Sequence, residues 1–345
     1  MSKRKVLRVS DPDGPSFGGF QVDQQGRAIK SSKINWPKSI WVELNEILMR
    51  EHLQLEDRGD EFVIVSSEGE NISLAFRSPP ALFAHLKHKH VAKRVNRLKS
   101  KSSQGRIFSS TGIDQQISSN YLNNLSISDK LVQFIFKARL QLLECNSLLH
   151  RYYPNTCRKT CPLCRNPHDT ASHVLNGCME FKNRYTARHD RVVDLMEEEL
   201  LKLHPTSHLL KNKIIDGGIL HVDSPLFSQL NHRKPDLFIL NHAQQEVFII
   251  EVSTPFDAFV QQCYETKFDY YKPLADLITL FTPYRCRVII LIIGSTGCAH
   301  TRLVPGLKLL GFGTRKSKAL AKYLCLSVSI GSSIVWKMRG MKVLA

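Results

Sequence analysis

Two short apolar runs separated by polar residues predict two neighbouring strands in the C-terminal half of the chain. Residues 237–240 are apolar, as are residues 247–252 apart from Glu251, and the polar residues between the two runs predict a hairpin turn. Along the second strand, a period of two residues places one group on a single face: Val247, Ile249, Glu251 and Ser253. A helix is predicted over about 258–271, and Pro273 should end it. A strand over 287–294 then completes a small mixed sheet.

Helical periodicity predicts further elements on both sides of this sheet. The apolar spacing indicates helices over 38–55, 128–149 and 186–203, and another over 317–326 near the end. Residues 62–65 and 72–76 predict a hairpin, whereas the first 35 residues, rich in Gly, Ser and Pro, predict a flexible segment. The fold class that follows is α+β with several domains.

Composition points to a polyanionic partner. The chain has 345 residues, 42% of them hydrophobic, and a formal net charge of +17. That length allows two or three domains, and the charge favours DNA or RNA over a membrane surface. We expect no membrane partner, because no apolar run looks long enough to span a bilayer and residues 288–293 are typical of a buried strand.

One stretch concentrates the positive charge. Residues 83–106 carry many cations and no acid, and a helix there would turn Leu86, Val91, Val95 and Leu98 toward the core. The cations would then form a ridge facing phosphates, although a solvated helix face is the ordinary alternative. The candidate nucleic-acid-binding residues in this stretch are Lys87, Lys89, Lys93, Arg94 and Arg97.

A cysteine–histidine cluster follows. Cys161-x2-Cys164-x8-His173-x4-Cys178 offers three thiolates and one imidazole at a spacing typical of structural zinc. His168 and Cys157 are close enough in sequence to replace a ligand, and unrelated free cysteines in a small core remain the other reading. Four protein ligands leave no open coordination position, so the ion would shape the fold. The nine cysteines thus suit a reducing compartment better than disulfides.

Two carboxylates flank the predicted hairpin. Asp236 opens its first strand and Glu251 lies near the end of the second, so both should reach the same edge of the sheet. Hard oxygen ligands of this kind suit Mg²⁺ or Mn²⁺, with water and a phosphate completing the coordination. Arg233 and Lys234, just before Asp236, are candidate phosphate contacts.

A lysine on the following helix is the third candidate catalytic residue. Lys267 shares a helical stripe with Val260, Tyr264 and Tyr271, the side expected to pack on the sheet. It either extends from the rim of that stripe into solvent or points at the two acids. In the second arrangement it would orient or deprotonate the attacking water and offset transition-state charge.

The cysteine–histidine cluster is one of several short motifs that follow one another along residues 80–345. The others, in order, are Ser103-Gln104-Gly105-Arg106, Lys137-Ala138-Arg139-Leu140, Ala187-Arg188-His189-Asp190, Lys234-Pro235-Asp236, the stretch from Glu251 to Asp257, the Lys267 helix and the stretch from Gly331 to Trp336. In order and spacing they resemble the C-terminal portion of non-LTR retrotransposon polyproteins with a restriction-like endonuclease, which insert at fixed sites such as ribosomal RNA genes.

The resemblance implies a fold like type II restriction enzymes and a metal-dependent nick in DNA that primes reverse transcription. It divides the chain into a flexible segment (1–35), a mostly helical basic region (36–155), a CCHC zinc knuckle (156–182) and an α/β endonuclease core (183–345). Its partners would be double-stranded target DNA in the nucleus, with the element's RNA as a second candidate; a homodimer is left open.

The chain departs from that family in two ways. Many restriction-type nucleases place the lysine two residues after the second acid, where this chain has Ser253; the retroelement enzymes draw it from the next helix, which points to Lys267. No Tyr-x-Asp-Asp signature of a polymerase occurs, so the chain resembles the part that follows the polymerase. Two alternatives remain: a non-catalytic nucleic-acid-binding remnant of a retroelement, and a structural zinc protein whose charge is incidental.

Overall fold

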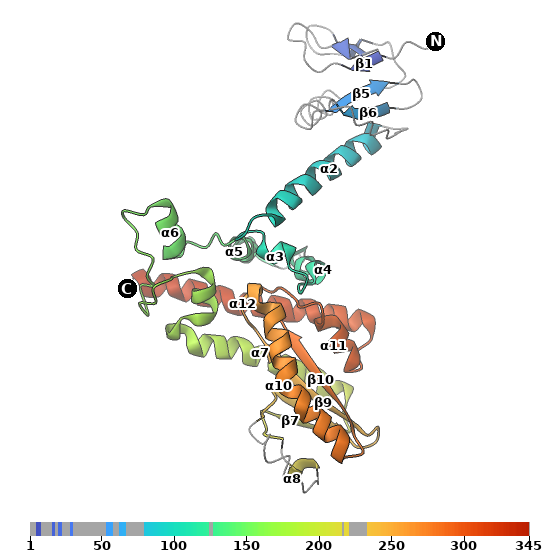
Figure 1. Ribbon diagram of the computed structural model, residues 1–345, viewed down its shortest axis with the longest axis vertical. Helices are drawn as coiled ribbons and strands as arrows, with labels where there is room; N and C mark the ends of the chain where they lie inside the picture. Colours follow the sequence, from blue (N-terminus) through green and yellow to red (C-terminus); the bar gives the residue numbers. More distant parts are fainter. Residues whose placement is uncertain are drawn as a thin grey trace. The chain divides into compact units, whose positions relative to one another are not determined.

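The computed structural model describes residues 79–123, 127–215, 217–220 and 233–344, together with six short strands among the first 66 residues (Figure 1). The chain forms two compact units, Met1–Leu98 and Lys99–Ala345. The boundary between them falls inside the region 36–155 that the sequence predicts as one helical linker. The second unit contains the zinc-ligand candidates and all three catalytic candidates.

The first unit contains an antiparallel sheet in the order β4-β3-β2-β1-β5-β6. Its strands are β1 (Lys5–Leu7), β2 (Ser16–Phe17), β3 (Phe20–Val22), β4 (Ala28–Ile29), β5 (Leu53–Asp57) and β6 (Phe62–Ser66). Four of them lie in the segment predicted to be flexible.

Two sequence expectations change here. The predicted helix over 38–55 lies outside the described residues up to position 52, and its last residues belong to β5, whose apolar and polar positions alternate as in a strand. Strand β6 pairs with β5. The predicted partner of β6, residues 72–76, lies outside the described residues.

Helix α2 (Pro79–Lys99) contains most of the basic stretch. Its prolines stand in the first turn, where the missing N–H groups have no intrahelical partner to lose. The expectation that Val91 and Val95 face a core is wrong, because they are 48% and 40% exposed. Leu98 is half-buried, and the side chain of Leu86 lies outside the described residues. Cations on every side of the helix leave no continuous apolar stripe to bury.

The second unit is built on a mixed four-stranded sheet in the order β10-β9-β8-β7. Strands β7 (His208–Lys211), β8 (Leu237–Asn241) and β9 (Glu246–Ser253) are antiparallel neighbours, and β10 (Arg285–Ile292) runs parallel to β9. The predicted hairpin and mixed sheet are therefore confirmed. The parallel pair requires a crossover, which helix α10 (Val260–Phe281) provides.

Helices cover both faces of this sheet. On one face, Phe248 and Ile250 join a core with helices α7 (Lys182–Leu203), α11 (Leu303–Leu309) and α12 (Thr314–Leu344). On the other face, Val247 and Ile249 pack with α10. The period of two along β9 thus separates the faces as the sequence predicts. The result is an α+β unit with the sheet between two helical layers.

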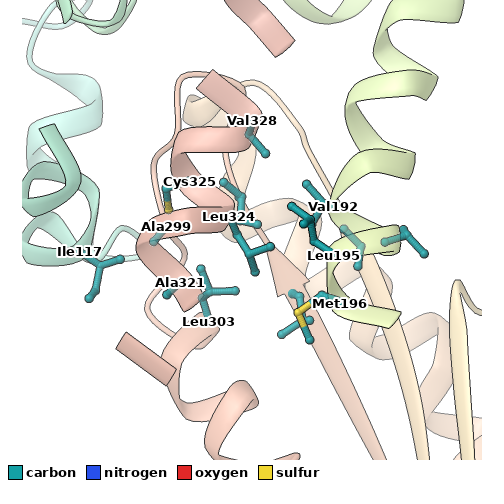
Figure 2. Packing of buried hydrophobic residues seen from close by; sticks show 14 of the residues in the cluster. Ile117, Val192, Leu195, Met196, Ala299, Leu303, Ala321, Leu324, Cys325 and Val328 are labelled. Atoms are coloured by element: carbon teal, nitrogen blue, oxygen red, sulfur yellow. The ribbon is translucent and has the colours of Figure 1, made fainter. Parts of the chain in front are cut away.

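The core on the α12 side joins segments that are far apart in sequence. Leu324 and Val328 of α12 lie near Val192 and Met196 of α7, and Ile117 of helix α4 (Gln115–Asn120) belongs to the same cluster (Figure 2). Burying apolar side chains of this size stabilises a fold by roughly 1.5–3 kcal/mol each. This shared core holds α4, α7, α11 and α12 against the sheet.

Two predicted helix boundaries are wrong. The expected helix 128–149 is two helices, α5 (Asp129–Arg139) and α6 (Asn146–Tyr152), because the chain turns at Gln141, which has a φ of 57°. Helix α10 continues through Pro273 instead of ending there. Its apolar stripe resumes with the buried Leu274 and Ile278, and this packing outweighs the hydrogen bond that proline cannot make.

Helix α12 is long and apolar enough, over Thr314–Met341, to meet the length and composition of a membrane span. The sequence expectation that no segment reaches that length is wrong on these two criteria. Half of the most apolar window is buried within the protein, where Leu324 and Val328 pack against α7. These contacts are those of a core helix.

Candidate functional site

The two predicted acids lie side by side on the two central strands of the mixed sheet, at the end where β8 begins. Asp236 directly precedes β8, and the pairing of Leu237 with Ile250 carries it to the position beside Glu251. Oδ2 of Asp236 accepts a hydrogen bond of 2.8 Å from the backbone N–H of Val252. Both carboxylates are buried, with exposed fractions of 8% for Asp236 and 5% for Glu251.

The structure brings Lys267 into contact with this pair. Its Nζ donates to Oε1 of Glu251 at 2.5 Å, so the lysine points at the acids instead of extending from the rim. Burial raises the pKa of Glu251, as does the charge of Asp236, while Lys267 acts in the opposite direction. Burial works to lower the pKa of Lys267, but Glu251 and Asp236 outweigh it and the pKa is raised.

Two carboxylate oxygens remain without a donor among the described residues. Oε2 of Glu251 is buried and accepts no hydrogen bond, and none reaches Oδ1 of Asp236. The hydroxyl of Tyr271 donates instead to the carbonyl of Lys234, at 3.1 Å. An unpaired buried carboxylate oxygen is costly, and a hard divalent cation would satisfy it. Two carboxylates are too few for a closed site, so water and substrate oxygens would have to complete the coordination.

His189 is a site residue that the sequence reasoning did not select. Helix α7 directs its Nε2 to Oδ2 of Asp236, 3.2 Å away, and Nδ1 lies 3.1 Å from Asp190. The hydrogen bond with Asp236, opposed by burial, raises the pKa of His189 to about 9. The only sequence signal was the motif Ala187-Arg188-His189-Asp190, which gave no role to the histidine.

The neighbouring Arg188 of that motif is structural. Its buried guanidinium donates to the carbonyls of Leu175 and Thr254 and to the hydroxyl of Ser332. These bonds join α7 to the segment before Cys178, to the residue after β9 and to α12. Arg188 therefore fixes the position from which His189 reaches Asp236.

Of the two predicted phosphate contacts, Arg233 is half-buried and Lys234 is exposed. The guanidinium of Arg233 lies over the ring of Tyr270, 4.9 Å from its centroid. Its Nε and Nη1 are buried and have no hydrogen-bond partner in the described part of the chain. Lys234 and Arg233 precede Asp236 by two and three positions, so both lie in the segment that leads into β8.

The other predicted cations belong to the first unit. Lys87, Lys93, Arg94 and Arg97 of α2 are exposed and Lys89 is half-buried. These cations lie around the helix, and Val91 and Val95 are exposed among them, so α2 lacks the predicted division into a cationic ridge and a core-facing side at these positions.

The four predicted zinc ligands converge. The ligand atoms of Cys161, Cys164, His173 and Cys178 all lie within 4.8 Å of one another. Sγ of Cys164 is 3.2 Å from Nε2 of His173, and Sγ of Cys161 is 4.0 Å from Sγ of Cys178. A tetrahedral zinc site has ligand atoms about 3.3–3.8 Å apart. Of the residues that the structure describes, these form the one group of three or more His, Cys, Asp or Glu able to hold a metal ion.

The structure also decides between the alternative ligands. His168 is exposed and Cys157 is only half-buried, and neither belongs to the converging group. Burial raises the pKa of the Cys161 thiol and raises that of Cys178 to about 12, because a buried thiolate is costly. A divalent cation held by these sulfurs would offset that cost. The donor set fits zinc.

The cysteine–histidine cluster is part of the main core. Cys161, Cys178 and the neighbouring Val174 and Leu175 belong to the same buried cluster as Phe248 of β9. Nearby, the buried Asp169 pairs with Arg339 of α12 at 2.5 Å. An ion at the cluster would therefore stabilise the unit that also holds Asp236 and Glu251.

No protein-family model matches the chain, and no curated protein matches it. Two buried carboxylates with open oxygens, a lysine bonded to one and a histidine bonded to the other suit a divalent ion and an anionic substrate.

Proposed function

We propose that this chain is a metal-dependent DNA endonuclease of retrotransposon origin, which nicks target DNA by hydrolysing a phosphodiester to prime reverse transcription. The observation that carries the proposal is the pairing of Asp236 with Glu251 at one sheet edge, with Lys267 bonded to the second acid. The parallel strands β9 and β10 with α10 between them support a core like that of type II restriction enzymes.

The roles follow from position. Asp236 and Glu251 would hold Mg²⁺ or Mn²⁺ through Oδ1 and Oε2, and such an ion supplies Lewis-acid activation of water and phosphate. Lys267, next to Glu251, would orient the attacking water and offset charge that develops on the phosphate. Arg233 and Lys234 would contact the substrate backbone.

The cysteine–histidine cluster and the cations of α2 would contribute to stability and to nucleic-acid binding. Zinc held by Cys161, Cys164, His173 and Cys178 would be structural, since four protein ligands leave no open position. The cations of α2 would bind phosphates of double-stranded target DNA or of the element's RNA, and such binding weakens steeply with salt. Action of this kind on a genomic target would place the protein in the nucleus.

A supercoiled-plasmid nicking assay tests the proposal. The purified chain should nick with Mg²⁺ or Mn²⁺ and not with EDTA. Asp236→Ala should abolish nicking, and Lys267→Ala should slow it by about 10²–10³-fold, while duplex binding stays nearly intact. Asp276→Ala is a matched control, because this exposed acid pairs with Lys272 on the outside of α10. Equal nicking by the chain and by Asp236→Ala would remove the assigned site.

Binding without catalysis is the second candidate function. It is favoured by the net charge of +17 and by the exposed cations of α2, which need no active site to hold a nucleic acid. Salt-dependent DNA binding with no metal-dependent nicking would support this reading and would identify the acids as remnants.

A further inference from the structure

A basic face with a tyrosine at its centre runs along the first half of α12. The cations recur every three or four residues, so they share one side of the helix: Arg315, Lys318 and Lys322. Leu320 and Leu324 are buried on the opposite side. Tyr323 is 50% exposed, so its ring is open to solvent beside these cations.

Two hollows meet at Tyr323. The first has a volume of ≈ 640 Å³ and includes Tyr121 and the three cations of α12 in its lining. The second, ≈ 420 Å³, lies between α7 and α12 and is lined by Arg184, Arg191 and apolar residues such as Ile330. Each is far larger than a simple ion requires and falls in the usual range for organic ligands.

The charged side chains that line these two hollows are all cationic. Neither hollow has an aspartate or glutamate in its lining, and residues 277–345 contain none at all. In the described part of the chain, no carboxylate pairs with the cations that line them. A third hollow on the other side of Tyr323 contains Glu198 and Glu199, and Glu199 binds Lys316. These acids mark the border of the basic face.

We propose that this face, formed by Arg184, Arg191, Arg315, Lys318 and Lys322 around Tyr323, binds single-stranded DNA. Cations that track a backbone combined with an exposed aromatic ring are the two elements of single-strand recognition. An unpaired base can stack on Tyr323 while flanking phosphates meet the cations. In a duplex the bases are already stacked on one another, so the ring would have nothing to receive.

The position of the face favours a strand released at the candidate active site, and in this respect the inference rests on the proposed endonuclease. Arg188 lines the second hollow and donates to the carbonyl of Thr254, the residue that follows β9. Its neighbour His189 bonds Asp236. One helix, α7, thus borders both the basic groove and the carboxylates, so a nicked strand leaving the acids would meet the groove.

Binding of a fluorescent single-stranded DNA oligonucleotide by the full chain tests the assignment. Tyr323→Ala should weaken binding by about tenfold or more, whereas Tyr323→Phe, which keeps the ring, should bind like the unchanged chain. The pair Lys318→Ala with Lys322→Ala should weaken binding and lower the salt slope by about 1.4, the value for two phosphate contacts on a single strand. Lys308→Ala, an exposed cation of α11 outside the face, is the control.

Comparison with a duplex and with RNA of the same sequence identifies the occupant. The proposal expects the Tyr323→Ala loss on single-stranded DNA and little loss on the duplex. Equal losses on both would show a purely electrostatic surface and overturn it. Tighter binding of RNA that depends on Tyr323 would overturn the choice of DNA. Unchanged single-strand binding in Tyr323→Ala and in the lysine pair would remove the site.

The same assay separates this inference from the proposed nuclease. Asp236→Ala should lose nicking and keep Tyr323-dependent strand binding. If the unchanged chain never nicks but its strand binding still requires Tyr323, only the endonuclease proposal fails. If it nicks normally and Tyr323→Ala binds strands as well as before, only the basic face fails.

Discussion

Nε2 of His189 lies 3.2 Å from Oδ2 of Asp236, so that helix α7 supports the first carboxylate of the sheet edge. The same oxygen accepts from the N–H of Val252 at 2.8 Å. With Oδ2 engaged twice, the carboxylate is held in one orientation and Oδ1 is the oxygen turned to other ligands. His189 is thus a positioning residue for Asp236.

Loss of this support should weaken metal binding. His189→Ala is expected to lower Mn²⁺ affinity by about 10–100-fold, the usual effect of removing a group that orients a metal ligand. Calorimetric titration with Mn²⁺, without DNA, measures it directly, and the Mn²⁺ dependence of nicking should shift in parallel. His208→Ala is the control, because His208 stands on β7 at the edge of the sheet. Equal Mn²⁺ affinity in His189→Ala and His208→Ala would contradict the positioning role.

Removal of a zinc ligand should unfold part of the core. Cys178 is buried with Val174 and Leu175 in the main cluster, so Cys178→Ser should lose bound zinc and lower the melting temperature. Metal analysis together with thermal unfolding would measure both effects. Cys157→Ser and His168→Ala, at the two rejected ligand positions, should keep zinc and stability. A Cys178→Ser protein with its full zinc content would show that the four ligands are assigned incorrectly.

The ion pair between Asp169 and Arg339 should matter more than pairs at the surface. Arg339→Met would leave the fully buried Asp169 carboxylate without its cation, at a cost of about 3–5 kcal/mol in the free energy of unfolding. Lys272→Met breaks the exposed pair with Asp276 and should cost less than about 1 kcal/mol. Urea unfolding in the presence of zinc compares the two. Similar losses would mean that Asp169 finds another partner.

Burial of His300 should make the fold sensitive to acid. The side chain is 2% exposed, its Nδ1 accepts from the N–H of Arg302 and its Nε2 lies 2.9 Å from Gln261. Burial first, then the charge of Arg302, lowers its pKa to about 4, and Glu265 opposes them weakly. The ring also stacks on Tyr264, with centroids 4.4 Å apart, so a neutral imidazole fills this site.

The pH dependence follows from the direction of that change. The unfolded chain takes up the His300 proton near pH 6.5 and the folded chain only near 4, so stability is complete above pH 6.5 and falls as the pH drops toward 4. The loss should be about 3 kcal/mol. Urea unfolding at pH 7 and pH 4.5 should show that His300→Gln loses less stability than the unchanged chain, by most of that amount. Parallel losses in the two proteins would exclude His300 as the source.

Local patterns were sufficient for much of the second unit. The strands around residues 237–252 are short apolar runs separated by a polar turn, a pattern that needs no distant partner to be recognised, and the two faces of β9 separate as predicted. The cysteine–histidine spacing likewise acts over a few residues, and the four ligands converge. Asp236 and Glu251 could be paired because a hairpin fixes which residues lie opposite each other.

Other predictions failed where packing outweighed local preference. Pro273 lies within α10 because the apolar stripe resumes beyond it, and Val91 and Val95 are exposed because α2 has no continuous stripe to bury. The break at Gln141 requires a positive φ, which the apolar spacing of the predicted helix 128–149 does not reveal.

The sequence by itself determined the chemistry available to this protein: its excess of positive charge, its four candidate zinc ligands and the two acids with a lysine after them. Tertiary structure alone decided that Lys267 contacts Glu251, that His189 reaches Asp236 across 47 positions, and that α7 and α12 enclose a basic groove around Tyr323. The reason is physical: side-chain type and short-range periodicity are local properties, whereas contacts between distant segments depend on how the helices pack on the sheet.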